Sequence, residues 1–69
     1  MRRHVQPLAT RQLEVLRDIA DGYRNKEIAN RLGISERTVK HHVTRINAIL
    51  ETDNRAHAAA VAIRRGHIK

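Results

Sequence analysis

The chain has 69 residues and a formal net charge of +7, and Tyr23 is its sole aromatic residue. A chain of this length forms one domain and is too short for an elaborate catalytic cleft, so no enzyme is expected. The absence of Cys excludes disulfides, thiolate zinc sites and a thiol nucleophile. No apolar run approaches the roughly 20 residues that cross a bilayer and no signal peptide is present, so a cytoplasmic protein is expected. The positive charge indicates a polyanionic partner, with nucleic acid favoured over a membrane surface.

Apolar residues recur along the chain at helical spacing, and no stretch alternates with a period of two. Residues 1–7 show no periodicity and are predicted to be an N-terminal tail, so the domain is expected over residues 8–69. The spacing predicts a first helix over residues 10–21, with a stop signal at Asp21-Gly22. One stripe of this segment is expected to face the core, and it comprises Leu13, Leu16, Ile19, Ala20 and Tyr23.

Three further helices are predicted. The second covers residues 25–32 and ends at Gly33, and the third covers residues 36–50 and begins after the hydroxyl N-cap Ser35. The fourth is Ala-rich and covers residues 55–65. The core is expected to contain Ile28, Ala29, Leu32, Val39, Val43, Ile46, Leu50, Ala58 and Ala62. The predicted fold is therefore a small all-α domain of four helices with short connections.

Residues 25–44 have the spacing of a helix-turn-helix unit. Ala29 lies where two helices cross closely, Gly33 follows at the turn, and Val39 lies on the inner face of the next helix. Residues 24–45 carry six Lys or Arg residues against two Glu residues, a net charge of +4. A rigid corner that presents a positive helix with polar outward side chains fits the major groove of double-stranded DNA.

Several motifs follow one another along nearly the whole chain. They are Thr10–Leu16, Gly22, Asn25–Ala29, Leu32–Ser35 and Thr38–His42, completed by Ile46, Leu50, Arg55 and Gly66–Ile68. With these motifs, residues 8–68 resemble the LuxR/FixJ/GerE-type DNA-binding domain of bacterial transcription regulators. The resemblance implies a four-helix domain whose third helix reads DNA and whose fourth helix forms a homodimer, without a cofactor. Such domains normally follow a receiver or ligand-sensing domain, so a free-standing regulator or a part of a larger one is expected.

The resemblance also assigns roles to individual side chains. The outward face of the third helix is expected to read bases through Lys40, His41, Thr44 and the adjacent Arg45. Contacts to DNA phosphates are expected from Asn25, Lys26, Thr38 and His42, which match family positions. The positive charges of Arg24 and Arg37 on the same unit are expected to add to these contacts. The fourth helix is expected to pair two copies, mainly on DNA, through His57, Ala60, Val61 and Arg64.

Four positions depart from the family pattern, and one of them is Gln12, which stands where Glu is usual three residues after the capping Thr. Ala9 and Arg24 stand where family members usually have a capping Thr and Ser, and each lost cap weakens the domain by about 1 kcal/mol. Thr10 or Asn25 is the alternative cap, one residue later. Ile49 stands where Lys is usual, which removes a backbone contact to DNA and leaves an apolar side chain to be exposed.

Neither a metal site nor a catalytic carboxylate pair is predicted. The adjacent His41 and His42 point about 100° apart on a helix. The remaining residues His4, His57 and His67 lack a ligand partner one turn away. Acidic and basic side chains of the first helix lie within one turn, so a solvated, ion-paired face is predicted. It comprises Glu14, Asp18 and Asp21 with Arg11 and Arg17.

Three other functions fit parts of the sequence. A sigma-factor-like module would bind promoters and contact RNA polymerase, but His42 and the Ala-rich fourth helix favour the LuxR type. A protein-interaction module would use the basic surface to sequester another regulator. RNA binding is disfavoured, because a helix does not enter the narrow groove of duplex RNA and the chain has no aromatic side chain besides Tyr23 for stacking on single strands.

Overall fold

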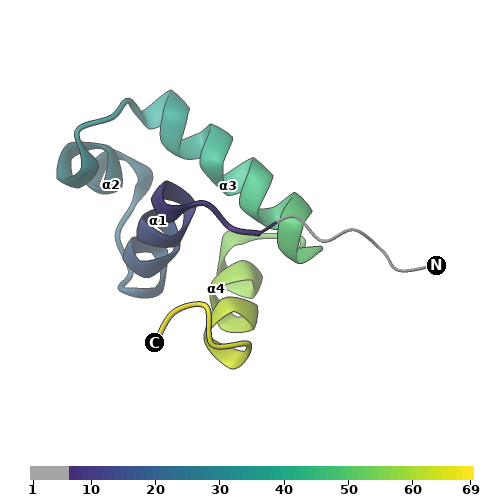
Figure 1. Cartoon of the computed structure of the whole chain (residues 1–69). Coiled ribbons are helices and arrows are strands. Elements are labelled where there is room, and N and C mark those ends of the chain that lie inside the picture. Colours follow the sequence, from purple (N-terminus) through teal and green to yellow (C-terminus); the bar gives the residue numbers. More distant parts are fainter. Residues whose placement is uncertain (1–6) are drawn as a thin grey trace.

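The computed structural model describes residues 7–69, and this part of the chain folds into four helices. They are α1 (Thr10–Ala20), α2 (Asn25–Leu32), α3 (Glu36–Leu50) and α4 (Arg55–Arg64). Figure 1 shows α1 between α2 and α4, with α3 running across all three. The predicted all-α, four-helix fold is confirmed. The first and fourth helices end one residue earlier than predicted, and residues 1–6 of the predicted tail lie outside the described part.

The last two helices begin with side-chain caps. The hydroxyl of Ser35 accepts a hydrogen bond from the backbone N–H of Thr38 at 3.0 Å, as predicted for α3. At α4, the Asn54 side chain accepts from the backbone N–H of His57 at 2.9 Å. Each cap satisfies one of the N–H groups that the first turn of a helix leaves unpaired.

The first two helices begin differently, at Ala9 and Arg24, whose side chains accept no hydrogen bond. The prediction that Thr10 or Asn25 caps these helices one residue later is therefore wrong. In α1 the Gln12 side chain accepts from the Ala9 backbone N–H at 2.8 Å. The equivalent bond in α2 has the same length and joins the Glu27 carboxylate to the Arg24 N–H. Only this half of a reciprocal capping box remains when the N-cap residue lacks a short polar side chain.

A left-handed residue makes the corner between α2 and α3. Gly33 has φ 70° and ψ 35°, a conformation that a residue without Cβ adopts readily. The backbone N–H groups of Gly33 and Ile34 both donate to the carbonyl of Ala29, which closes the end of α2. Ala29 is buried where the helices meet, and Val39 is fully buried on the inner face of α3. The corner therefore fixes the direction of α3 relative to α2.

The core is built from small aliphatic side chains of all four helices and of the C-terminal segment. Its members are Val15, Leu16, Ile28, Ala29, Val39, Ile46, Leu50, Ala58, Ala62 and Ile68. Because α1 packs against α2, α3 and α4, its buried surface is wider than the single predicted stripe. Val15 is fully buried beside Leu16, whereas Ala20 is exposed, contrary to prediction. Leu13, Ile19 and Tyr23 are half-buried at the edge of the core.

Two side chains near the end of the chain are less exposed than expected. Val61 is 6% exposed, so the prediction that it points outward from α4 is wrong. The reason is that α4 packs against both α1 and α3, which buries Val61 in addition to the predicted Ala58 and Ala62. Ile49 is half-buried and packs against the core, so the expectation that it is exposed is also wrong.

Candidate nucleic-acid interface

The outer face of α3 carries a group of exposed polar side chains. Lys40, His41, Thr44 and Arg45 are all exposed, while Ile46 on the opposite side is fully buried. The hydroxyl of Thr44 donates to the carbonyl of Lys40 at 3.1 Å, which leaves its methyl group and its two acceptor lone pairs available. The structure thus brings the four predicted base-reading residues onto one accessible side of a helix.

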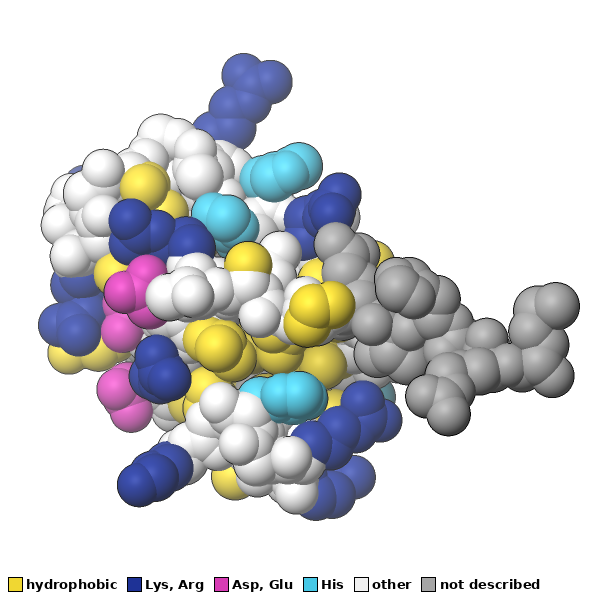
Figure 2. Space-filling view, viewed as in Figure 1, with side chains coloured by type: hydrophobic (Ala, Val, Ile, Leu, Met, Phe, Trp, Pro, Cys, Tyr) yellow, Lys and Arg dark blue, Asp and Glu magenta, His cyan; other side chains and the backbone are white. Residues whose placement is uncertain are grey.

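The residues predicted to contact phosphates lie at the starts of α2 and α3 and on the side of α3. Arg24, Lys26 and Arg37 are exposed, while Asn25, Thr38 and His42 are half-buried. The side-chain oxygens of Ser35 and Thr38 are 2.9 Å apart, so Thr38 is held by the cap of α3. In Figure 2, Lys and Arg side chains spread over the visible face with His side chains among them, and few acidic side chains interrupt them.

His42 occupies the border between the exposed face of α3 and the core. Burial lowers the pKa of His42 below its usual value, and the positive charges of His41 and Arg11 lower it further. The two His rings have centroids 6.4 Å apart. His42 therefore carries less positive charge at neutral pH than a free histidine, until an anion approaches it.

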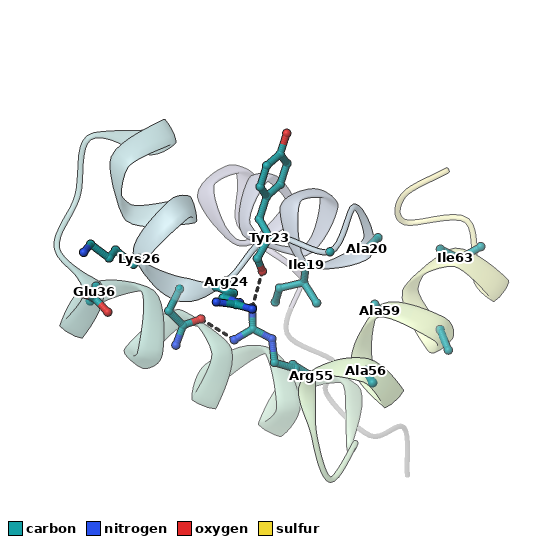
Figure 3. A pocket seen from close by; sticks show the side chains of 13 residues that line it. Ile19, Ala20, Tyr23, Arg24, Lys26, Glu36, Arg55, Ala56, Ala59 and Ile63 are labelled. Atoms are coloured by element: carbon teal, nitrogen blue, oxygen red, sulfur yellow. Dashed lines mark hydrogen bonds between the residues drawn. The ribbon is translucent and has the colours of Figure 1, made fainter.

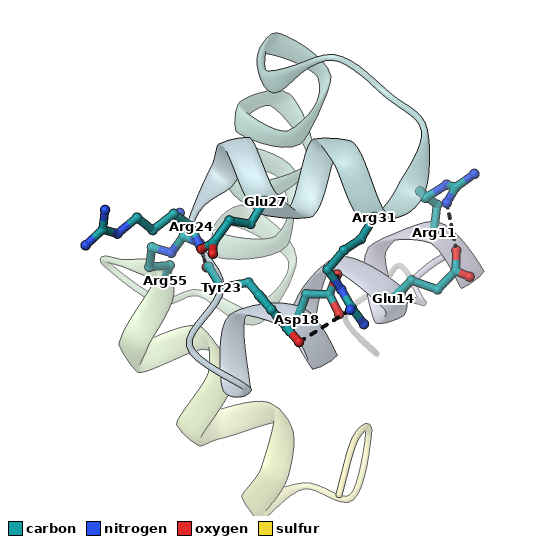
Figure 4. A network of polar contacts seen from close by, with 8 residues as sticks. All are labelled: Arg11, Glu14, Asp18, Tyr23, Arg24, Glu27, Arg31 and Arg55. Carbon is teal, nitrogen blue, oxygen red and sulfur yellow. Dashed lines mark hydrogen bonds and ion pairs between the residues drawn. The ribbon is translucent and has the colours of Figure 1, made fainter.

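An ion pair between α1 and α2 replaces part of the predicted solvated face. Asp18 is only 5% exposed, and one of its carboxylate oxygens lies 3.1 Å from Nε of Arg31. The guanidinium of Arg31 also stacks over the Tyr23 ring at 4.3 Å from the centroid. The hydrogen bond to Asp18 raises the pKa of Arg31. Figure 4 shows these side chains pointing toward one another, so Arg31 ties the two helices together and Asp18 is not solvated as predicted.

The predicted pair between Arg11 and Glu14 is present at 3.3 Å, one turn apart on α1. Both side chains are about two-fifths exposed, at 42% and 40%, so the pair adds little stability. Sequence spacing identified this local pair, whereas the pair between Asp18 and Arg31 joins residues 13 positions apart on different helices. No local spacing rule detects such a contact.

A second contact that the sequence did not reveal joins α4 to the start of α2. Arg55 donates one hydrogen bond to the side-chain oxygen of Asn25 and another to the carbonyl of Tyr23 at 3.0 Å. Figure 3 shows both bonds from the Arg55 guanidinium. The family motif included Arg55, but no role followed from it. This contact holds Asn25, one of the predicted phosphate-contacting residues, against α4.

An open groove of about 870 Å³ lies between α4, the end of α1 and the start of α2. Its α4 wall presents a stripe of exposed apolar side chains at Ala56, Ala60 and Ile63, the last of which is 47% exposed. His57 and Arg64, predicted for dimerisation together with Ala60, are exposed on the same helix. Ile63 was not predicted to lie on this face, although it stands at i, i+4, i+7 spacing with Ala56 and Ala60.

Within residues 7–69, neither a membrane-spanning helix nor a set of metal ligands is found. None of the described helices is long and apolar enough to cross a membrane. Three or more His, Asp or Glu side chains do not come together as a set of metal ligands in this part of the chain. His4 lies outside the described residues.

Together, the glycine corner and the exposed polar helix define a helix-turn-helix domain for binding DNA. The sequence pattern of the family described as "Bacterial regulatory proteins, luxR family", also named GerE, matches residues 6–62. The chain belongs to this family. It is therefore a DNA-binding domain of the LuxR/GerE type of transcription regulator. This family consists of DNA-binding proteins and is not a known class of enzyme.

Relatives of known sequence are bacterial transcriptional regulators. The chain is 44% identical over 64 residues to the uncharacterized transcriptional regulatory protein YxjL of Bacillus subtilis, covering 93% of this chain and 29% of that protein. It is 38% identical over 68 residues to the transcriptional regulatory protein DegU of Brevibacillus brevis, covering 99% and 29%. The chain thus spans less than a third of the length of these curated relatives.

Solved structures share the fold closely. The response regulator ChrA of a heme-sensing two-component system superposes with a TM-score of 0.91 at 36% identity, over 96% of this chain and 33% of that chain. The transcription factor GerE superposes with a TM-score of 0.86 at 28% identity, over 93% of this chain and 97% of that chain.

Proposed function

We propose that this domain recognises a specific sequence of double-stranded DNA by placing the outer face of α3 in the major groove. The observation that supports this proposal best is the exposed polar face of α3 on a rigid helix-turn-helix corner. Its base-reading set is Lys40, His41, Thr44 and Arg45. The phosphate-contacting set is Arg24, Asn25, Lys26, Arg37, Thr38 and His42, which positions the protein without reading sequence. Membership of the luxR family favours this function over a sigma-factor-like module or a sequestering module.

Replacing Lys40 by Ala and Lys26 by Ala should produce different defects. Lys40 can donate to guanine O6 or N7, so its loss is expected to relax the preference at one base pair by about 1–3 kcal/mol. Loss of Lys26 is expected to weaken binding to all duplexes about equally. It should also lower the salt slope, which is the slope of log affinity against log salt concentration, by about one unit. Selection of bound sites from a random duplex pool with both variants measures the difference.

Both side chains are exposed, so circular dichroism should show the same fold in the two variants and the wild type. The assignment of the reading face is wrong if Lys40→Ala keeps the wild-type site preference and only loses affinity. A wild-type protein that selects no site from the pool would contradict sequence-specific binding altogether.

We further propose that two copies pair on DNA through α4, with His57, Ala60 and Arg64 in the contact and Ile63 in place of the buried Val61. Small side chains at Ala56 and Ala60 permit a close approach of two helices. The exposed apolar area is modest, which fits pairing that depends on DNA. The interface is expected to be isologous, so each change is present twice.

Changing Ala60 to Glu is expected to reduce cooperative binding to a duplex with two half-sites, because it places two like charges in the contact. Binding to a duplex with one half-site should be nearly unchanged. Mobility-shift titrations on the two duplexes measure this difference, and Ala60→Ser serves as a control of similar size. Equal loss on both duplexes means that the contact lies elsewhere or that the variant is unfolded.

Lower pH is expected to strengthen DNA binding through His42, because phosphates favour the charged imidazolium and free histidine titrates at about 6.5. His42 starts with a lowered pKa in the free domain. Bound DNA raises the pKa of His42. The affinity for DNA therefore increases as the pH falls from the pKa of His42 in the bound domain to its pKa in the free domain. Between pH 8 and pH 6, the wild type should gain more affinity than a His41→Gln, His42→Gln double variant. Fluorescence anisotropy titrations measure this gain.

The same lowered pKa has the opposite effect on folding. The unfolded chain binds the proton of His42 more readily than the folded domain, so folding stability decreases as pH falls below about 6.5. Circular dichroism at each pH must therefore accompany the titrations. An identical pH dependence of binding in the wild type and the double variant would show that these histidines take up no proton on binding.

A further inference from the structure

We infer that Arg55 is a positioning residue for DNA binding, which holds the start of α2 so that Asn25 and the first backbone N–H groups face a phosphate. The inference rests on the proposed function, in which Asn25 contacts DNA. Arg55 is the first residue of α4 and lies 30 positions after Asn25 in the chain. Arg55 belongs to neither the base-reading set nor the phosphate-contacting set.

The guanidinium of Arg55 forms hydrogen bonds with the residues on both sides of Arg24, the N-cap of α2. One nitrogen donates to the side-chain oxygen of Asn25, and the other donates to the carbonyl of Tyr23 at 3.0 Å (Figure 3). A planar guanidinium offers two donors in a fixed fork, so the two acceptors are held relative to each other. The carbonyl of Arg24 already accepts from Ile28 at 2.9 Å, in the first turn of α2. The fork therefore fixes the direction of this turn relative to α4.

The same contact determines which way the Asn25 amide points. Arg55 offers only donors, so the oxygen of the Asn25 amide must face it. The amide nitrogen then points away from Arg55, and no residue in the described part of the chain accepts a hydrogen bond from it. A phosphate oxygen needs hydrogen-bond donors, which the outward amide nitrogen supplies.

The first turn of α2 provides further donors at the same place. Arg24 places no side-chain oxygen over the N–H groups of this turn, in contrast to Ser35 in α3 and Asn54 in α4. The carboxylate of Glu27 accepts a hydrogen bond of 2.8 Å from the backbone N–H of Arg24. The N–H groups that follow remain available to an anion at a helix N-terminus. The direction of these N–H groups, like that of the Asn25 amide, depends on the two hydrogen bonds that Arg55 donates.

A double-mutant cycle on the 69-residue chain tests this role, with duplex DNA as the probe at fixed salt concentration. Arg55→Lys keeps the charge but not the fork, and Asn25→Ala removes the amide. Each single change is expected to lower the affinity about tenfold, the size of one lost hydrogen bond to a charged group. The Arg55→Lys, Asn25→Ala double variant should bind no more than about threefold more weakly than Asn25→Ala alone. Both changes remove the contact between Arg55 and Asn25, and only the bond of Arg55 to the Tyr23 carbonyl is left to lose.

The double variant would overturn the inference if it lost affinity about a hundredfold, which is the product of the two single effects. Effects multiply in this way when the two residues contribute to binding independently. The salt slope should stay unchanged in Arg55→Gln, which removes the charge, and this result separates positioning from direct attraction to a phosphate. Arg65→Lys makes the same substitution at the exposed C-cap of α4 and should change affinity less than twofold. An equal loss in Arg65→Lys would also overturn the inference.

Folding is monitored by circular dichroism and by the side-chain NH₂ resonances of Asn25, which should shift in Arg55→Lys. If Arg55→Lys unfolds, Arg55→Gln replaces it in the cycle, because glutamine retains one donor group without the fork. The two failures can be distinguished. A wild-type chain that binds no duplex contradicts the proposed function, whereas a wild type that binds with an additive cycle contradicts only the role of Arg55.

Discussion

Raising the salt concentration from 50 to 200 mM is expected to weaken duplex binding by a few hundredfold to about a thousandfold. The basic side chains of residues 24–45 should neutralise roughly 4–6 phosphates per monomer, which corresponds to a log–log slope of about −4 to −5. Arg31 contributes less than its charge suggests, because its guanidinium is engaged with Asp18 and Tyr23. Affinity measured at several salt concentrations gives the slope directly.

A variant pair makes the result specific to this surface. Arg37→Ala removes an exposed charge of the phosphate-contacting set and should lower the slope by about one unit. Lys69→Ala removes an exposed charge at the end of the chain, away from the helix-turn-helix unit, and should leave the slope unchanged. A wild-type slope near zero would contradict binding dominated by phosphates. Equal slopes in both variants would place the phosphate contacts elsewhere.

Replacing Leu16 by Ala should remove most of the folding stability of the domain. Leu16 is fully buried in a core that contains no aromatic side chain. A buried Leu→Ala change costs about 2–5 kcal/mol, because hydrophobic contact is lost and a cavity remains. A domain of this size has a total unfolding free energy of about 3–10 kcal/mol. Urea denaturation followed by circular dichroism measures the change.

Ile63→Ala is the matched control, since Ile63 is a large aliphatic residue that is 47% exposed. Its loss should lower the unfolding free energy by less than about 1 kcal/mol. If both variants lose the same stability, Leu16 does not occupy the centre of the core. Addition of a saturating duplex should recover part of the loss in Leu16→Ala, because DNA binds the folded state.

The order and approximate bounds of the helices could be predicted because their ends carry local signals. Gly33 requires a left-handed conformation and Ser35 offers a cap, so the corner between α2 and α3 follows from a few adjacent residues. The inner face of α3 was equally clear, because Val39, Ile46 and Leu50 recur at helical spacing and are buried. Where a signal extends over neighbouring residues only, sequence reasoning was sufficient.

Side chains whose environment depends on packing between helices could not be predicted in the same way. The Ala-rich α4 has little contrast between its faces, so its spacing did not show that Val61 is buried. Asp18 was assigned to local partners on α1, but its partner Arg31 comes from α2. The contact of Arg55 with Asn25 likewise depends on how α4 docks against α2. These contacts depend on how the helices pack against one another, and no regular spacing of residues in the sequence indicates them.

The division of α3 into an inner and an outer face has an evolutionary consequence. Its inner side chains support the core, whereas Lys40, His41 and Arg45 are exposed and support none of it. Surface substitutions of this kind usually change stability by less than about 0.5 kcal/mol. A lineage can therefore exchange these side chains one at a time after gene duplication, with each intermediate still folded. New operator preferences become accessible through single substitutions, while the corner that aims the helix is inherited unchanged.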